Sequence, residues 1–211
     1  MTGVQTCALP ISPDPDHWKW LGTKKPTVHV LFSGRLEKYK GVFTILRAAK
    51  ALTGNGAKRQ YIFTFIGNGS EKSEMLSRIR EWNLYDTVSI RSVSYDDMPG
   101  VYKTADIFVA PSISTPTYEE QYCTVLLEAQ AMGLPIITTR SGGIPENVGD
   151  TALFIPEDDE TALAKHLTTL AGSPSLRVKQ GEKALRRAQT IHDSKKIASR
   201  IYSVYEKVLA G

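Results

Sequence analysis

The apolar residues of this chain fall into short runs, and each run is followed by a polar turn and then by a helical pattern. Runs rich in β-branched and aromatic residues predict strands at 28–32, 61–66, 87–90, 107–110, 135–139 and 152–155. Helical spacing predicts helices at 42–52, 71–82, 96–104 and 124–132, and three further helical segments out to Leu209. The first helix is expected to stop at Gly54-Asn55-Gly56. Because no two strands are joined by a hairpin turn, the pattern predicts a doubly wound α/β fold, a parallel, Rossmann-like sheet of about six strands with helices on both faces.

The composition is that of a globular protein. The 211 residues are 41% hydrophobic and 23% charged, and such a length forms one large domain without disulfides or a structural metal. The formal charge of +4 is spread along the sequence, which argues against a nucleic-acid partner. Apolar runs stay well short of the ~20 residues of a membrane-spanning helix, so we expect at most peripheral membrane contact. Cys7 and Cys123 are far apart, which favours a reducing, cytoplasmic setting.

The first residues are expected to lie outside the folded domain. Residues 1–11 (MTGVQTCALPI) resemble a translated sequencing adapter, and the alternative is a short leader of the protein's own. Residues 12–26 are rich in Pro, Asp and Lys and have no sustained period, which predicts a linker. The domain is therefore expected to span 27–211, and an adapter at the start would mean that an amino-terminal part is missing.

In an open parallel sheet, ligands bind beyond the carboxyl ends of the strands, so the loops that follow strands are the candidate sites. The first of these loops, FSGRLEKYKG, has Gly34 at the strand exit and Arg35 and Lys40 before the next helix. Two cations near a helix entrance favour a pyrophosphate group, because free N–H groups there already attract anions. The alternative for this loop is a solvated basic turn.

A second loop and its helix carry two carboxylates, Glu120 and Glu128. They flank a predicted helix start, where the N–H groups of Thr124 and Val125 are candidates to donate to phosphate oxygens. A carboxylate on either side is suited to hold sugar hydroxyl groups. Glu120 is otherwise a solvent-exposed side chain, whereas Glu128 lies in a largely apolar helix, where an ionised group needs a partner.

Two glycine-containing turns follow other strands. Ser141–Asn147 (SGGIPEN) lets the backbone approach a ligand closely and opens a short helix, but alone it predicts only a turn. Ile66–Ser70 (IGNGS) is able to cradle a phosphate or a nucleoside, yet such turns are common in any fold of this kind. Neither turn identifies a function by itself.

Taken in order, these motifs resemble family 4 glycosyltransferases of the GT-B fold. The resemblance rests on GRLEKYKG, FIGNGS, SYDDMPGVYKTADIFVAPS, the glutamate pair with EAQAMGLPIITT, and SGGIPE, and it covers nearly everything from Val28 to the end. It implies the carboxyl-terminal, donor-binding half of a retaining, metal-independent hexosyltransferase. The donor would be a UDP- or GDP-linked sugar, without a cofactor. The acceptor, a glycan, a lipid or a small molecule, would be bound by the missing amino-terminal domain.

The resemblance also implies a role for each candidate residue. Arg35 and Lys40, in the loop that Gly34 opens, would hold the diphosphate and form the catalytic set together with Glu120. Glu120 would contact the donor sugar, and Glu128 would bind the ribose. The Val93 backbone would contact the base, and the Thr124 and Val125 N–H groups would donate to phosphate or sugar. Arg35→Ala and Lys40→Ala are each expected to weaken nucleoside-diphosphate binding while thermal stability stays nearly unchanged.

The chain departs from many members of this family after the first glutamate. Gln121 and Cys123 stand around Tyr122, where a Glu-Gly-Phe-Gly pattern is common, which leaves the donor sugar undefined. Cys123 is either a reactive thiol near a helix start or a small packing residue, and packing is favoured because no histidine neighbours it in sequence.

Several other polar residues are expected to be structural or exposed. The four histidines are isolated and lack metal-ligand spacing: His17, His29, His166 and His192. A solvated face is predicted for the basic residues of the last helices: Arg177, Lys179, Lys183, Arg186, Arg187, Lys195, Lys196 and Arg200. The alternatives to a transferase are a nucleotide-sugar epimerase of the same fold and a non-catalytic flavodoxin-like module. A receiver-like module is disfavoured because the first strand ends without an acidic cluster.

Overall fold

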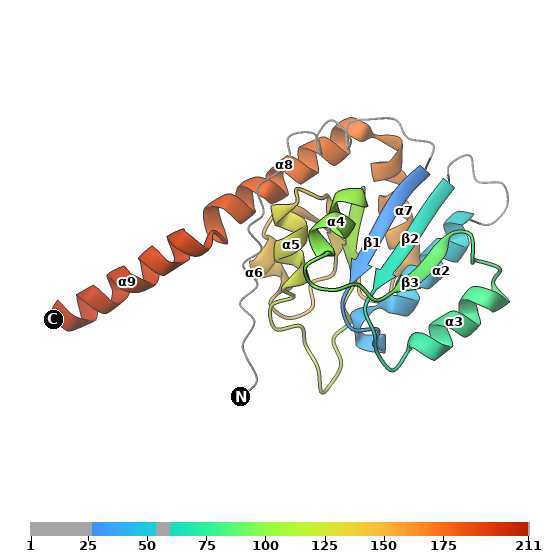
Figure 1. The fold of residues 1–211 in the computed structure, drawn as a ribbon, viewed down its shortest axis with the longest axis horizontal. Coiled ribbons are helices and arrows are strands. Elements are labelled where there is room, and N and C mark those ends of the chain that lie inside the picture. Colours follow the sequence, from blue (N-terminus) through green and yellow to red (C-terminus); the bar gives the residue numbers. More distant parts are fainter. Residues whose placement is uncertain (1–26, 54–59, 211) are drawn as a thin grey trace.

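The structure, a computed structural model, describes residues 27–53 and 60–210. Its centre is a six-stranded parallel sheet with the strand order β3-β2-β1-β4-β5-β6 (Figure 1). The strands are β1 (Thr27–Ser33), β2 (Gln60–Ile66), β3 (Val88–Arg91), β4 (Ile107–Ala110), β5 (Ile136–Thr138) and β6 (Ala152–Phe154). The predicted doubly wound α/β fold is therefore confirmed, and each predicted strand is present.

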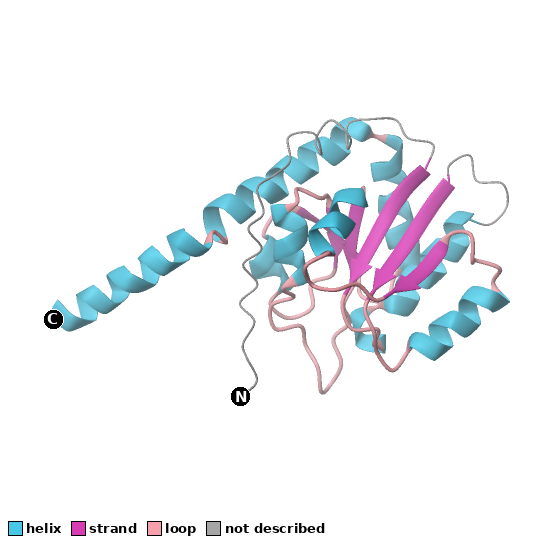
Figure 2. Cartoon of the chain, viewed as in Figure 1, coloured by secondary structure: helices cyan, strands magenta, loops and turns pink. Residues whose placement is uncertain are grey.

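Helices cover both faces of the sheet (Figure 2). One face packs against α2 (Val42–Thr53), α3 (Lys72–Glu81) and α7 (Glu160–Gly172). The other face packs against α4 (Met98–Thr104), α5 (Val125–Ala131) and α6 (Ile144–Val148). Successive strand side chains alternate between these layers, so that Val30 lies in the first apolar core and Leu31 in the second. The strands that carry the loops are thus packed against an apolar layer on each face of the sheet.

The helix predictions are confirmed to within two residues at each end. One element was not predicted, a short 3₁₀ helix η1 (Lys38–Lys40) that precedes α2. It ends at Gly41, whose φ is +71°, and a Cβ there would lie 2.0 Å from the Pro111 carbonyl oxygen. Only glycine tolerates that approach, which fixes the loop after β1 against the end of β4. The predicted stop at Gly54-Asn55-Gly56 lies outside the described residues.

The turn after β2 supports the loop after β1. Gly67 has a φ of +146°, and a Cβ on it would lie 1.9 Å from the Gly34 carbonyl oxygen. The N–H of Gly34 donates to the Ile66 oxygen, and the N–H of Leu36 donates to the Asn68 oxygen, both over 2.9 Å. The two turns therefore pack backbone to backbone, so the IGNGS segment shapes its basic neighbour.

The carboxyl-terminal part consists of α8 (Pro174–Ile191) and α9 (Ser194–Ala210), and α9 projects away from the sheet (Figure 1). The prediction of a solvated basic face is wrong for Arg177, which is fully buried. Its guanidinium donates to the carbonyl oxygens of Leu170 and Ala171 over 2.7 and 3.2 Å. The last carbonyls of a helix lack intrahelical partners, so this buried cation caps the end of α7.

Arg187 departs from the same prediction, because it is half-buried and donates to the carbonyl oxygens of Glu146 and Asn147 at the end of α6. Lys183 is half-buried as well. The basic residues that lie exposed as expected are Lys179, Arg186, Lys195, Lys196 and Arg200. Among the described helices, none combines the length and the apolar character needed to cross a membrane.

Candidate functional site

The candidate residues lie on segments that follow strands at the carboxyl edge of the sheet: the loop after β1, the segment after β3, and the segment after β4 with the first turn of α5. The strand order reverses at β1, because β2 and β3 lie on one side of it and β4 to β6 on the other. The loop after β1 carries Arg35 and Lys40, and the segment after β4 carries Glu120. Neighbouring parallel strands end at the same edge, so residues about 80 positions apart in sequence are brought into contact.

Lys40 and Glu120 form an ion pair between Nζ and Oε2. The side chains are only 16% and 8% exposed, and the Ser112 hydroxyl also donates to Oε2 over 3.0 Å. Burial by itself would raise the pKa of Glu120, but the hydrogen bond and the charge of Lys40 outweigh it and hold the pKa below its usual value. For Lys40, burial lowers the pKa and the contacts with Glu120 and Tyr118 more than reverse that effect. Both groups are therefore charged at neutral pH.

Two tyrosines connect this ion pair to Arg35. The rings of Tyr39 and Tyr118 pack with centroids 4.0 Å apart, and Lys40 Nζ lies 5.4 Å from the Tyr118 centroid. The exposed guanidinium of Arg35 lies 5.5 Å from the Tyr39 centroid. Arg35 and Lys40 thus lie on the same pair of aromatic rings, with Lys40 half-buried and Arg35 exposed to solvent.

Glu128 belongs to a second, deeper contact between α4 and α5. The Tyr102 hydroxyl donates to its Oε2 over 2.6 Å, and Glu128 as a whole is only 7% exposed. Burial raises the pKa of Glu128, and the hydrogen bond from Tyr102 offsets only part of that effect. Burial and the nearby carboxylate also raise the pKa of Tyr102 well above its usual value. The partner expected for this glutamate is therefore a neutral phenol.

The segment that carries Glu120 lies directly against the turn after β5. A Cβ on Gly142 would lie 2.1 Å from the Glu120 carbonyl oxygen, and one on Gly143 would lie 2.1 Å from the Gln121 oxygen. The N–H of Gly143 donates to the Glu120 oxygen over 2.8 Å. The Ser141 hydroxyl accepts a long bond from the Glu120 N–H, at 3.4 Å. The paired glycines therefore allow this loop to pack against the turn after β5.

Thr124 and Val125 lie at the start of α5, as predicted. The exposed Thr124 makes no side-chain capping bond to the helix. Cys123, just before it, is buried, and its φ is +51°. Burial and the charge of Glu120 raise the pKa of its thiol to about 12. The structure therefore supports the packing role for Cys123 and disfavours a reactive thiolate.

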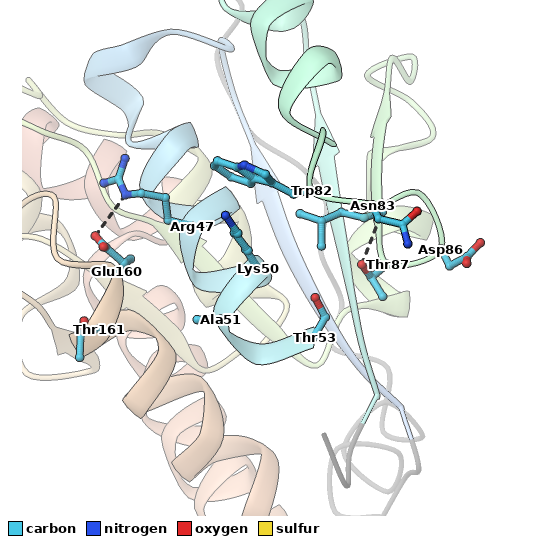
Figure 3. Close-up of a pocket in the computed structure, with 11 residues that line it drawn as sticks. Arg47, Lys50, Ala51, Thr53, Trp82, Asn83, Asp86, Thr87, Glu160 and Thr161 are labelled. Carbon is cyan, nitrogen blue, oxygen red and sulfur yellow. Dashed lines mark hydrogen bonds and ion pairs between the residues drawn. The ribbon is translucent and has the colours of Figure 1, made fainter. Parts of the chain in front are cut away.

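Val93 lies on the segment after β3 and lines a pocket of about 610 Å³ on the sheet face beside α4. Thr64, Ser89 and Arg91 contribute from the strands. A larger pocket, of about 880 Å³, lies along α2, where Lys50 Nζ is 4.5 Å from the Trp82 centroid (Figure 3). The candidate donor residues do not line the larger pocket, which separates it from the carboxyl-edge site.

Sequence reasoning missed the partners that orient the two glutamates. These are Ser112, Tyr118 and Ser141 around Glu120, and Tyr102 beside Glu128. Tyr102 falls inside the quoted motif SYDDMPGVYKTADIFVAPS, but a spacing pattern does not say which carboxylate it meets. Within the described residues there is no group of three or more His, Cys, Asp or Glu side chains placed to hold a metal ion. Metal independence stays a prediction.

A doubly wound parallel sheet with cations and buried carboxylates at its switch point is characteristic of α/β domains that bind nucleotides. The chain belongs to the family of glycosyl transferases group 1, whose family model matches residues 16–187. The match begins inside the segment assigned above to a leader and linker. The division at residue 27 stays a prediction.

Curated relatives include two bacterial D-inositol 3-phosphate glycosyltransferases. The protein of Corynebacterium glutamicum (strain R) is 30% identical over 90% of this chain and 46% of its own length. That of Corynebacterium jeikeium (strain K411) is 32% identical over 78% of this chain and 40% of its own length. The chain thus spans less than half the length of these relatives.

Solved structures give the same fold. Sucrose-phosphate synthase from Thermosynechococcus elongatus superposes with a TM-score of 0.78 and 25% identity, over 95% of this chain and 50% of that one. Anabaena HepE, solved in complex with UDP and glucose, has a TM-score of 0.74 and 19% identity, over 93% of this chain and 53% of that one. The second likeness shows the fold alone.

Proposed function

We propose that this chain is the nucleotide-sugar-binding half of a retaining hexosyltransferase. The observation that carries the proposal is the contact between Lys40 and Glu120 at the switch point, with Arg35 on the adjoining aromatic pair. This arrangement places an anion-binding group and a hydroxyl-binding group side by side, which suits the junction of a diphosphate and a sugar. The family membership and the HepE complex, which holds UDP and glucose, support the same assignment.

Arg35 and Lys40 would bind the diphosphate and stabilise the negative charge that grows on it as the bond to the sugar breaks. In the structure the charge of Lys40 is balanced by Glu120. A bound diphosphate would share Lys40 with that carboxylate, while Arg35 already faces solvent. Each such charge-assisted contact contributes roughly 2 to 4 kcal/mol to a transition state.

The other candidate residues would hold the remaining parts of the donor. Glu120 would accept hydrogen bonds from sugar hydroxyl groups, which explains why a buried carboxylate is kept ionised there. Glu128 would bind the ribose, and Val93 the base through its backbone. The N–H groups of Thr124 and Val125 would donate to phosphate or sugar oxygens.

Transfer would also need an acceptor, and we propose the complete reaction only for a chain that includes the other half found in its relatives. The acceptor would be a glycan, a lipid or a small molecule. A cytoplasmic location, at most peripheral membrane contact, the absence of a nucleic-acid partner and the absence of a cofactor stay predictions.

Titration calorimetry with UDP and with GDP tests the proposal on the chain as it is. We expect saturable binding of at least one of them, and a loss of about tenfold in affinity for Arg35→Ala, because one charged contact is removed. Lys179→Ala is the matched control, since it removes an exposed cation from α8. Folded protein that binds neither nucleotide at millimolar concentration, or equal binding by Arg35→Ala and wild type, would count against the assignment.

A further inference from the structure

Asn147 is a fully buried polar residue near the end of α6, and its side chain contacts two other segments of the chain. Its Oδ1 accepts a hydrogen bond from Gln130 Nε2 over 2.8 Å. Its Nδ2 donates to the carbonyl oxygens of Tyr122 and Cys123, the latter over 3.4 Å. A buried amide with this many partners is anchored in one orientation.

Gln130 determines which way that amide faces. The two hydrogens of its Nε2 are directed at the Leu126 oxygen, over 3.1 Å, and at Asn147 Oδ1. A reversed Asn147 amide would put its NH₂ group against the NH₂ group of Gln130 and its oxygen against two carbonyl oxygens. Since neither contact is a hydrogen bond, the NH₂ group must face the loop at 122–123.

The backbone conformation of residues 122–123 has to be stabilised by contacts with other segments. Cys123 has a φ of +51°, a left-handed conformation that is strained for a residue with a side chain and persists only where the surroundings impose it. With trans peptide bonds, carbonyls that point at Asn147 turn the N–H groups of Cys123 and Thr124 to the opposite side. The other end of α6 acts on the same loop, because the Gly143 N–H donates to the Glu120 oxygen.

Two residues at the end of α8 contact the backbone of Asn147. Arg187 Nε donates to the Asn147 carbonyl oxygen over 2.7 Å, and His192 Nε2 lies 2.9 Å from the same oxygen. The other ring nitrogen of His192 lies 3.3 Å from the Tyr122 hydroxyl. The backbone and the side chain of Asn147 are therefore both fixed, and the loop is held from two sides.

We propose that Asn147 is a positioning residue for the sugar end of the donor: it holds residues 120–124 in the conformation that directs Glu120 at the sugar. The proposal rests on the function proposed above. In this proposal the SGGIPEN segment does more than pack closely against the backbone of residues 120–121. Its Asn147 side chain also fixes residues 122–123, which depart from the common Glu-Gly-Phe-Gly pattern. Asn147 touches no donor atom in this scheme and acts only through the loop.

The test compares Asn147→Ala and Gln130→Met with Thr151→Val. Gln130→Met removes the group that orients Asn147 and leaves Asn147 in place. Thr151→Val is the control, because it removes a buried hydroxyl that donates to the Val148 oxygen, just beyond α6 and away from the loop. Amide hydrogen exchange is measured at Leu126 and Leu127, whose N–H groups donate to the Cys123 and Thr124 oxygens, and in the strands. Calorimetry compares UDP with UDP-glucose, or GDP with GDP-mannose if the wild type prefers guanine.

We expect exchange at Leu126 and Leu127 to speed up roughly tenfold or more in both test variants, with strand exchange and the control unchanged. Affinity for the nucleotide sugar should fall about tenfold, and affinity for the bare diphosphate by less than about threefold. Unchanged exchange at these two amides, or equal losses for sugar nucleotide and diphosphate, would overturn the proposal. If the wild type binds no nucleotide, the proposed function fails, and exchange alone still decides whether Asn147 holds the loop.

Discussion

Replacing Lys40 by methionine removes the cation of a largely buried ion pair and keeps the length of the side chain. Breaking a fully buried pair costs about 3–5 kcal/mol, because it leaves an uncompensated charge. Here Lys40 is 16% exposed and the Ser112 hydroxyl still donates to Glu120, so we expect a loss of about 2 kcal/mol at pH 7.5. For a domain of this size that lowers the melting temperature by about 4–8 °C.

The loss should depend on pH in a defined direction. In the wild type the pKa of Glu120 lies below its unfolded value, so its contribution to stability is present above the unfolded pKa and disappears as the pH falls through the folded pKa. Without Lys40, burial dominates and raises the pKa, so the variant is least stable relative to wild type at neutral pH. The difference should begin to shrink above 4.5, the ordinary value for this carboxyl, as the pH falls through the raised pKa of the variant. It should shrink further as the pH falls through the lowered pKa of the wild type.

Urea denaturation of wild type, Lys40→Met and Arg35→Ala at pH 7.5 and pH 4.5 measures both effects. Arg35 is exposed, so Arg35→Ala should stay within about 0.5 kcal/mol of wild type at either pH. The structure thus changes the sequence-based expectation that both substitutions leave stability nearly unchanged. Equal stabilities of Lys40→Met and Arg35→Ala at pH 7.5 would refute the argument from burial.

Three further predictions concern other parts of the site. Gly142→Ala should destabilise the chain by more than about 2 kcal/mol, because the φ of Gly142 is +49° and a Cβ there would meet the Glu120 oxygen. Gly100→Ala is the control, since Gly100 lies on α4 with open space around it, and this variant should be neutral or stabilising. Thermal denaturation measures both. Glu128→Gln should raise the free energy of unfolding at pH 7.5 by about 1 kcal/mol, because the raised pKa of Glu128 makes its ionised form unfavourable in the folded chain above the unfolded pKa. The same substitution should weaken UDP binding in calorimetry. A gain in UDP affinity would contradict the ribose assignment. In a Cys7→Ser background, Cys123 should resist iodoacetamide at pH 8 until the chain unfolds, as followed by mass spectrometry.

Much of the fold was predictable because its signals are local. The mostly apolar run at Val28 to Phe32 and the helical pattern that follows it each specify an element without knowledge of the rest of the chain. The η1 turn was missed because it depends on a distant contact, the approach of Gly41 to Pro111. Arg177 was misplaced for a related reason, since amphipathic spacing says which face a residue lies on but not that its guanidinium reaches the Leu170 and Ala171 carbonyl oxygens at the end of α7.

For the site, the sequence indicated the charged residues but not their contacts. Arg35, Lys40, Glu120 and Glu128 were identified by residue type and by their position after strands. That Lys40 meets Glu120, and that Glu128 meets a phenol instead of a cation, follows from how β1, β4 and α4 lie side by side. Such pairings depend on tertiary packing, which no spacing of residues along one chain encodes.

The contact of Gly142 and Gly143 with the backbone of Glu120 and Gln121 has a practical consequence for engineering. A designer who wants another sugar specificity would exchange the segment around residues 118–124 for that of a relative. Any change in the course of that graft would collide with the glycine turn, which lacks side chains able to move aside. The two segments, and Asn147 with them, should therefore be transplanted as one cassette, and natural variants should alter them together.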